Sequence, residues 1–211
     1  MEPFGICRFC DIVFGEYHYN EIDEPFAINN EFFAIASIGP LVEGWTLIVP
    51  KSHQLSMRCV YDSPMFADFL GYVLPPLIQQ YGSLIAFEHG ANSEGSITAC
   101  GTAHAHLHLV PFGESLLPEL QSSDMQWIEC HASEIASKSG ANEYLFYSEL
   151  GTKEFWQDPL AYLHVLENPV PQFFRRLIAK RSGGYEVSDY KRFPHFDTAR
   201  QTRNVLASSF A

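Results

Sequence analysis

The most chemically suggestive stretch of the chain is a run of three alternating histidines, His104, His106 and His108, which ends at Pro111. Successive side chains of a β-strand point to opposite faces, so this spacing predicts three imidazoles on one face, roughly 6.6 Å apart. An imidazole can serve as a nucleophile, a general acid or a metal ligand near neutral pH. Histidine makes up only 9 of the 211 residues, which favours a functional site over a strand with three exposed histidines.

A second group of residues that could do chemistry is the C-x-x-C pair formed by Cys7 and Cys10. Zinc prefers four sulfur or nitrogen ligands in a tetrahedron. His53, which follows a predicted strand, and one histidine of the triplet could complete such a set. From the residues alone, redox chemistry and a pair of unliganded cysteines remain alternatives.

Residues 90–102, which lead into the histidines, form a loop rich in glycine, serine, threonine and asparagine. Small residues let backbone N–H groups approach phosphate oxygens, and hydroxyl groups add further donors. Beside the histidines this loop is therefore predicted to cradle phosphate, with Asn92, Gly101 and Thr102 as candidate substrate-binding residues.

Positive charge is concentrated at the C-terminal end of an acidic chain, whose net charge of −12 excludes binding of bulk nucleic acid through the general surface. Residues 175–211 hold eight lysines and arginines against three acidic residues. A helix is predicted at 170–181. Its spacing places Gln172, Arg175 and Arg176 on one side, where an arginine fork could bind substrate phosphates. A solvated basic face is the alternative.

The composition indicates a soluble globular enzyme, because apolar residues make up 46% and charged residues 18% of the chain. Five cysteines, an odd number, argue against a disulfide framework and favour a reducing cytoplasm. The opening residues lack the pattern of a signal peptide, and no apolar run is long enough to span a membrane. We therefore expect a cytoplasmic protein that does not bind membranes.

Segments of β-forming residues predict four strands, at residues 32–38, 45–49, 84–88 and 104–110. One helix is predicted between the second and third strands, beginning near Pro64, and Pro75-Pro76 should break or kink it. Strands that follow strands, with an isolated helix between them, predict an α+β fold with an antiparallel sheet.

The pattern changes at residue 113, which divides the chain into a catalytic core at 1–112 and a C-terminal extension at 113–211. The extension is predicted to hold a short strand near Trp127, a hairpin of strands at 144–148 and 161–165, and the basic helix. Because it supplies aromatic residues, this α/β extension should pack on the core.

The histidine run, together with two further motifs, resembles the histidine-triad (HIT) superfamily of nucleotide hydrolases and transferases. The motifs are the C-x-x-C opening, which continues to Glu16, and residues 44–53. The likeness covers about residues 4–112, and larger bacterial relatives with C-terminal extensions are similar. It implies a HIT-like antiparallel sheet with flanking helices.

The resemblance implies a nucleotide phosphohydrolase or nucleotidyltransferase that cleaves a P–O–P or P–N bond. His106 would attack the α-phosphorus and form a nucleotidyl-histidine intermediate, while a backbone carbonyl holds its other ring nitrogen. His108 would face the bridging atom and protonate the leaving group. In zinc-bearing relatives, a structural zinc is held by residues that correspond to Cys7, Cys10, His53 and His104.

Two positions depart from the family pattern, since Trp45 stands where many members have a fourth histidine, and Ser37 stands where many have an acidic ribose ligand.

Three alternatives remain open: a phosphorylase or transferase with the same intermediate, a metal-dependent hydrolase with all three histidines as ligands, and a zinc-stabilised nucleotide-binding protein without turnover. The expected partner is a small nucleotide, and a homodimer is allowed for.

Overall fold

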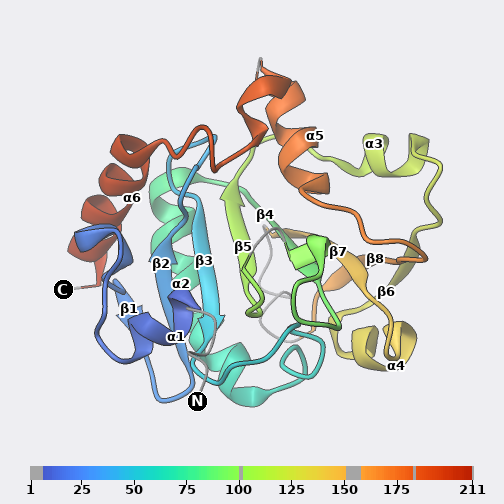
Figure 1. Cartoon of the computed structure of the whole chain (residues 1–211), viewed down its shortest axis with the longest axis horizontal. Coiled ribbons are helices and arrows are strands. Elements are labelled where there is room, and N and C mark those ends of the chain that lie inside the picture. The colour runs from blue at the N-terminus through green and yellow to red at the C-terminus, as the bar shows by residue number, and fades with distance from the viewer. Residues whose placement is uncertain (1–6, 100–101, 151–157, 183, 211) are drawn as a thin grey trace.

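The computed structural model describes residues 7–99, 102–150, 158–182 and 184–210, and in this part of the chain eight strands form one sheet (Figure 1). The strands are β1 (Ala27–Ile28), β2 (Phe32–Ala36), β3 (Thr46–Pro50), β4 (Leu84–Gly90), β5 (Leu107–Pro111), β6 (Ile128–His131), β7 (Tyr144–Leu150) and β8 (Leu160–Val165). Their order is β1-β2-β3-β5-β4-β7-β8-β6, and each neighbouring pair is antiparallel. The predicted α+β fold with an antiparallel sheet is confirmed.

Helices flank this sheet on both faces. The α-helices are α1 (Arg8–Val13), α2 (Pro64–Tyr81), α3 (Leu117–Ser122), α4 (Ile135–Ser139), α5 (Phe173–Arg181) and α6 (Phe196–Ser209). Short 3-10 helices are η1 (Asn20–Asp23), η2 (Ile97–Ala99), η3 (Ala132–Glu134) and η5 (Tyr185–Ser188). In Figure 1, α2 lies behind β2 and β3, and α6 lies beside the β1 edge. Among the described residues, no helix has the length and apolar character needed to cross a membrane.

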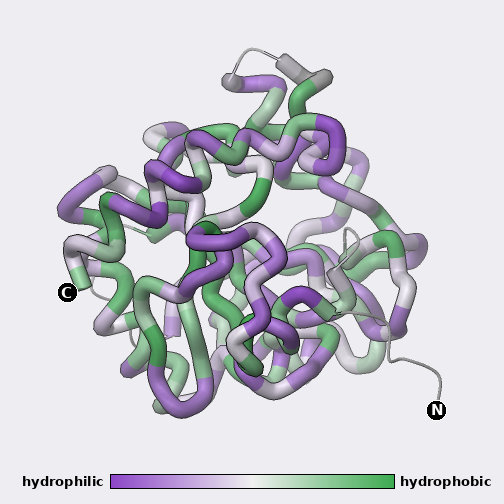
Figure 2. The backbone as a smooth tube through the Cα atoms, turned by 60° about the vertical axis from the view of Figure 1, so that its left-hand side comes forward, coloured by the Kyte–Doolittle hydropathy of each residue, from purple (hydrophilic) through white to green (hydrophobic). Residues whose placement is uncertain are grey.

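Alternation along the strands divides the hydrophobic core between the two faces of the sheet. Leu107 and Leu109 of β5 pack in the cluster that contains the buried side of α2. Val110 packs in a second cluster, together with residues of α1 and α5. His108 lies on this second face, where it stacks on Phe87. Figure 2 shows hydrophobic segments inside the fold and many hydrophilic stretches at its periphery.

Strand β5 begins later than the sequence predicts. Its first residue is Leu107, so His104 and His106 precede the strand, and the predicted row of three imidazoles on one strand face is wrong. The backbone N–H of His104 donates to the carbonyl of Thr102, which holds the segment before β5 in an irregular conformation. The three histidines can therefore point in different directions.

Helix α2 continues where the two prolines were expected to break it. It extends from Pro64 to Tyr81 with Pro75 and Pro76 inside. Each proline removes one N–H donor from the helix. The buried side chains around the prolines are Val73, Leu74 and Leu77. Burial of such side chains contributes about 1.5–3 kcal/mol each, which offsets the loss of helical hydrogen bonds.

The C-terminal extension packs on the core and also continues the core's sheet. Its strand β7 pairs with β4, β8 pairs with β7, and β6 pairs with β8 at the edge. Helix α5 packs on the face that carries His108, and its Phe174 stacks on Phe87 with ring centroids 4.8 Å apart. Near the β1 edge of the sheet, Thr202 of α6 accepts a hydrogen bond from the backbone N–H of Gly44 at 2.9 Å. The segments before and after residue 113 thus share one sheet.

A buried carboxylate joins β4 to the loop that follows β3. Glu88 is 1% exposed and accepts hydrogen bonds from the backbone N–H of Met57 and from the hydroxyl groups of Tyr61 and Tyr144. Burial raises the pKa of this carboxyl group. Three donors converge on one side chain, so its removal would take a buried acceptor from each of them.

Replacing Glu88 with alanine is expected to destabilise the fold by about 3 kcal/mol or more, because each buried donor left unpaired costs about 1–3 kcal/mol. Urea unfolding followed by circular dichroism measures the free energy of unfolding. Glu114→Ala is the control, since Glu114 forms an exposed ion pair with Arg181 and such pairs contribute little. Equal stability of the two variants would contradict the role assigned to Glu88.

Candidate functional site

The start of β5 and the segment before it border a small cavity of about 50 Å³. Two histidines of the run, His106 and His108, line it. Two cationic side chains, those of Arg8 and Arg175, also line it, and none of its described lining residues is acidic. Arg8 forms an ion pair with Asp23, a buried residue outside this lining. In a chain with a net charge of −12, the positive charge that Arg175 brings to this cavity favours an anionic ligand.

His106 is held in one tautomer by the backbone. Its Nδ1 lies 2.8 Å from the carbonyl oxygen of His104, so Nδ1–H donates and the Nε2 lone pair stays available. The carbonyl contact implied by the resemblance is therefore present. Burial lowers the pKa of His106 to about 4, which keeps the imidazole neutral at pH 7. A neutral imidazole with an available lone pair can act as a nucleophile.

His108 lies within β5, opposite Leu47 on β3 and Phe87 on β4. Its ring stacks on Phe87 with centroids 4.5 Å apart and lies 4.7 Å from the ring of His106. The indole N–H of Trp45 donates to His108 Nδ1 at 2.9 Å. Burial holds the pKa of His108 well below its usual range, and the neighbouring groups His106, His89 and Arg175 act in the same direction. His108 is therefore a second neutral imidazole beside the cavity.

The third histidine does not line this cavity and instead joins the two cysteines. Four potential ligand atoms lie within 4.8 Å of one another, and they belong to Cys7, Cys10, His53 and His104. His104 Nδ1 is 3.3 Å from Cys7 Sγ, and His53 Nδ1 is 3.3 Å from Cys10 Sγ. Two sulfur and two nitrogen donors at these separations are compatible with a tetrahedral metal site.

Further hydrogen bonds orient both histidines of this cluster. His104 Nε2–H donates to the carbonyl oxygen of Pro50 at 2.8 Å, and His53 Nε2 lies 3.0 Å from a carboxylate oxygen of Glu94. A partner at Nε2 leaves Nδ1 of each ring as the atom directed at the thiols. The donor set thus fits a metal ion in chemistry and in direction. The resemblance implied a metal site at these four residues, and the structure brings them together, but no local pattern indicated the partners Pro50 and Glu94.

The predicted phosphate-binding loop contributes one of its three candidate residues to the cavity. Thr102 lines the cavity. The side chain of Asn92 is exposed, does not line the cavity and donates to the carbonyl of Ala141 at 2.9 Å. Gly101 lies outside the described residues. The loop is joined to the extension through Thr98, whose hydroxyl accepts a hydrogen bond from the backbone N–H of Val170.

Helix α5 brings Arg175 to the cavity, but from the buried side of the helix. Arg175 is 4% exposed and shares this side with Phe174. Its guanidinium donates to the backbone carbonyls of Ser188 and Gly39 and lies over the Trp45 ring at 4.8 Å. Arg175 therefore links α5 to the core while one part of its side chain borders the histidine cavity.

The other two residues predicted beside Arg175 do not line the cavity. Gln172 precedes the first turn of α5 with a φ of 53°, and it borders a separate hollow together with Lys191. Arg176 is half-buried, and its charge contributes to the lowered pKa of His89. The predicted grouping of Gln172, Arg175 and Arg176 on one helix side is wrong, because Gln172 is not helical and Arg175 faces inward.

Several cavity residues were not predicted from the sequence, and among them are Arg8, His89 and Tyr190. His89 Nε2 is buried without a hydrogen-bond partner among the described residues, and burial lowers the pKa of His89 to about 3. His89 could have been identified from the sequence, because it lies between the strand predicted at 84–88 and the loop that leads into the histidine run. Tyr190 lies between α5 and α6, and no local pattern connects it to the histidines.

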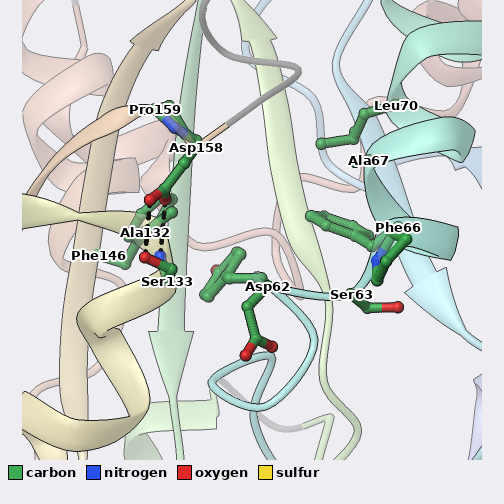
Figure 3. Close-up of a pocket in the computed structure, with 12 residues that line it drawn as sticks. Asp62, Ser63, Phe66, Ala67, Leu70, Ala132, Ser133, Phe146, Asp158 and Pro159 are labelled. Atoms are coloured by element: carbon green, nitrogen blue, oxygen red, sulfur yellow. Dashed lines mark hydrogen bonds between the residues drawn. The ribbon is translucent and has the colours of Figure 1, made fainter.

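A larger hollow of about 270 Å³ lies on the other face of the sheet, between α2 and η3 (Figure 3). Phe66 and Leu70 of α2 and Phe146 of β7 form its apolar wall. At its rim, Asp158 accepts hydrogen bonds from the backbone N–H and the hydroxyl of Ser133. Its described lining residues include no histidine, cysteine, lysine or arginine. We therefore assign the chemistry to the smaller histidine cavity.

Comparisons with known proteins found relatives for about half of the chain. An uncharacterized HIT-like protein of Mycoplasma genitalium is 31% identical over 108 residues, which are 50% of this chain and 72% of that protein. An uncharacterized 16.1 kDa HIT-like protein of Mycoplasma pneumoniae is 28% identical over 106 residues, or 50% and 70% of the two chains. A solved structure of a hypothetical histidine triad nucleotide-binding protein from Sulfolobus tokodaii has a TM-score of 0.37 and 22% identity over 52% of this chain and 70% of that one. No family model matches the chain.

Proposed function

Since the chain belongs to the histidine-triad (HIT) superfamily, we propose that it is a nucleotide phosphohydrolase or nucleotidyltransferase. It cleaves a P–O–P or P–N bond of a small nucleotide through a nucleotidyl-histidine intermediate. His106 is the nucleophile, and His108 contacts the atom that bridges the α-phosphorus and the leaving group.

The observation that carries this proposal is the hydrogen bond from His106 Nδ1–H to the carbonyl of His104. It directs the lone pair to Nε2, and burial keeps the ring neutral. In the first step Nε2 attacks the α-phosphorus and the leaving group departs with the bonding electrons. In the second step water or another acceptor attacks the phosphorus, and the P–N electron pair returns to Nε2.

Two arginines support the assignment of an anionic phosphate to this cavity. Because His106 and His108 are neutral and Arg8 is paired with Asp23, the net positive charge at the cavity comes mainly from Arg175. Arginine suits this task because its guanidinium stays charged and has five N–H donors, so Arg175 can donate to a phosphate oxygen in addition to the carbonyls of Ser188 and Gly39. Thr102 adds a hydroxyl group at the same cavity. Binding roles for Asn92, Gly101, Gln172 and Arg176 stay predictions from the sequence.

For the second site, we propose that the cluster of Cys7, Cys10, His53 and His104 holds a structural zinc ion. Zinc favours thiolate and imidazole ligands in a closed tetrahedron, and four protein ligands leave no position for a reacting water. Such an ion would stabilise the contact between α1 and the segment that precedes β5. A metal-dependent hydrolase that uses all three histidines as ligands is disfavoured, because His104 groups with the cysteines while the other two line the cavity.

Replacing His106 with alanine is expected to lower turnover of a dinucleoside polyphosphate at least about 10³-fold, because the nucleophile is lost while the arginines still bind nucleotide. Mass spectrometry of rapidly quenched unmodified protein should detect a nucleotidyl adduct on His106. His131→Ala is the control, since the His131 side chain is 60% exposed on β6. Full activity of His106→Ala, or no adduct with any nucleotide tested, would refute the proposed function.

Purified protein is expected to contain about one zinc per chain, and Cys7→Ser should lose most of this metal. Because metal binding contributes to folding, Cys7→Ser and chelator treatment should both lower the melting temperature. Elemental analysis and thermal melting measure the two effects. Cys59→Ser serves as control, since Cys59 is an exposed cysteine outside the cluster. Metal-free protein with unchanged melting would overturn the zinc assignment.

Replacing Arg175 with methionine is expected to weaken nucleotide binding at least about tenfold, because a charged hydrogen-bond donor to phosphate is lost. Arg175→Lys should recover part of this affinity, since it restores the charge without the fork. Calorimetric titration gives the affinity, and thermal melting shows whether each variant is folded. If Arg175→Met binds as well as Lys191→Ala, a change at an exposed residue, then α5 does not bind the phosphates.

A further inference from the structure

Trp45 determines which nitrogen of His108 carries the proton. An indole N–H can donate a hydrogen bond but cannot accept one. Trp45 Nε1 lies 2.9 Å from His108 Nδ1, so Nδ1 accepts, and the ring hydrogen of His108 is on Nε2. Protonation of Nδ1 would place two N–H groups against each other and break a buried hydrogen bond.

The packing around this pair prevents it from separating. Trp45 is fully buried, and its ring lies edge-on to Phe87 with centroids 5.8 Å apart. Phe87 in turn stacks on His108 at 4.5 Å, and Leu47 lies opposite His108 in the neighbouring strand. Close-packed interiors leave little freedom for such rings to move apart. The Trp45–His108 hydrogen bond is thus a fixed feature of the site.

The titratable and charged groups that face His108 also oppose a second proton on its ring. Arg175 from α5 carries a positive charge, and His106 from the segment before β5 and His89 near the end of β4 compete with His108 for a proton. None of the described residues that line the cavity is acidic, so no carboxylate there offsets them. Burial acts in the same direction, and together these effects hold the pKa of His108 well below its usual range.

We propose that Trp45 is a positioning residue that holds His108 as a neutral hydrogen-bond donor at Nε2–H, and that the site is thereby matched to substrates whose leaving group is a phosphate anion. This inference rests on the proposed function and specifies its substrate class. It assigns His108 a hydrogen bond to the bridging oxygen in place of the proton transfer implied by the resemblance. Position 45, where many family members have a histidine, then sets substrate choice in this chain.

The chemical steps balance without an acid. His106 Nε2 forms a bond to the α-phosphorus, the P–O bond breaks, and its electron pair leaves on the bridging oxygen of a phosphate anion. His108 Nε2–H donates a hydrogen bond to that oxygen as its charge develops, and His108 keeps its proton. Water then attacks the phosphorus, the P–N electron pair returns to His106 Nε2, and a proton from the water passes to solvent.

An amine leaving group has a different requirement. Nitrogen departs from phosphorus readily only when it gains a proton, and an effective acid has a pKa near the working pH. A neutral imidazole can donate a hydrogen bond but cannot give up its remaining proton under these conditions. A phosphate ester or polyphosphate leaves as a stable anion and needs only the hydrogen bond. The site therefore distinguishes P–O–P from P–N substrates.

NMR of the full chain, with histidine ¹⁵N shifts recorded between about pH 6 and pH 8, tests the tautomer. His108 is expected to keep a protonated Nε2 and an unprotonated Nδ1 across this range. Trp45→Phe keeps an aromatic ring but removes the N–H, so His108 should then show a mixture of tautomers. Phe174→Leu is the control, because it alters the same hydrophobic cluster without removing the Trp45 donor. An Nδ1–H tautomer or an imidazolium at His108 in the unmodified chain would overturn the proposal.

The leaving group is tested by comparing the cleavage rates of two substrates. Both contain the same nucleoside phosphate, which is linked to phosphate in one substrate and to a primary amine in the other. The unmodified chain should cleave the phosphate-linked substrate at least about 10²-fold faster, the size of a typical general-acid contribution. Trp45→Phe should reduce this preference at least about tenfold, and Phe174→Leu should keep it. Equal rates for the two substrates in the unmodified chain overturn the substrate assignment. If Trp45→Phe does not fold, the tautomer and the rate ratio of the unmodified chain decide the proposal.

Failure of the proposed function gives a different result from failure of this inference. If neither substrate leaves an adduct on His106, the proposed function fails and the substrate class fails with it. The NMR measurement still reports whether Trp45 holds His108 in the Nε2–H form. Adduct formation with both substrates at equal rates supports the proposed function and overturns the inference.

Discussion

Strand β5 is paired on both sides, with Leu47 of β3 opposite His108 on one side and Phe87 of β4 opposite it on the other. This double pairing fixes the register of β5, and a shift of one residue would exchange its two faces. With the observed register, Leu107 and Leu109 enter the cluster beneath α2, while His108 enters the face covered by α1 and α5. The position of the preceding histidines follows from where this pairing begins.

Each histidine of the run has a different fixed partner, and that partner sets its chemistry. The carbonyl of Pro50 accepts from His104 and directs its Nδ1 to the cysteines. The carbonyl of His104 accepts from His106 and leaves Nε2 with its lone pair. The indole of Trp45 donates to His108 and leaves Nε2 as a donor. Three identical side chains therefore present a nitrogen directed at two thiols, a lone pair and an N–H group.

The sequence by itself determined the chemical groups and the fold class. Strand-forming segments bounded by glycine and proline gave nearly correct positions for β2, β3 and β4, because their runs of apolar residues reflect burial, whereas β5 begins later than predicted. The pair Cys7 and Cys10, with His53 and the histidine run, predicted a cluster that the structure brings within ligand distance. The run also identified the superfamily, which the comparisons support. These features are local in sequence or carried by residue type.

Only the tertiary structure decided the direction of each histidine and the role of the extension. Alternation predicted one strand face for all three imidazoles, yet strand pairing starts only at Leu107, and the earlier residues follow contacts from other segments. Helical spacing could not show that Arg175 faces inward, because the carbonyls that hold it belong to Gly39 and to Ser188 of η5, which lie outside α5. Nor could sequence show that Trp45 donates to His108, since that contact joins residues 63 positions apart. Long-range packing fixes such contacts, and no local pattern encodes them.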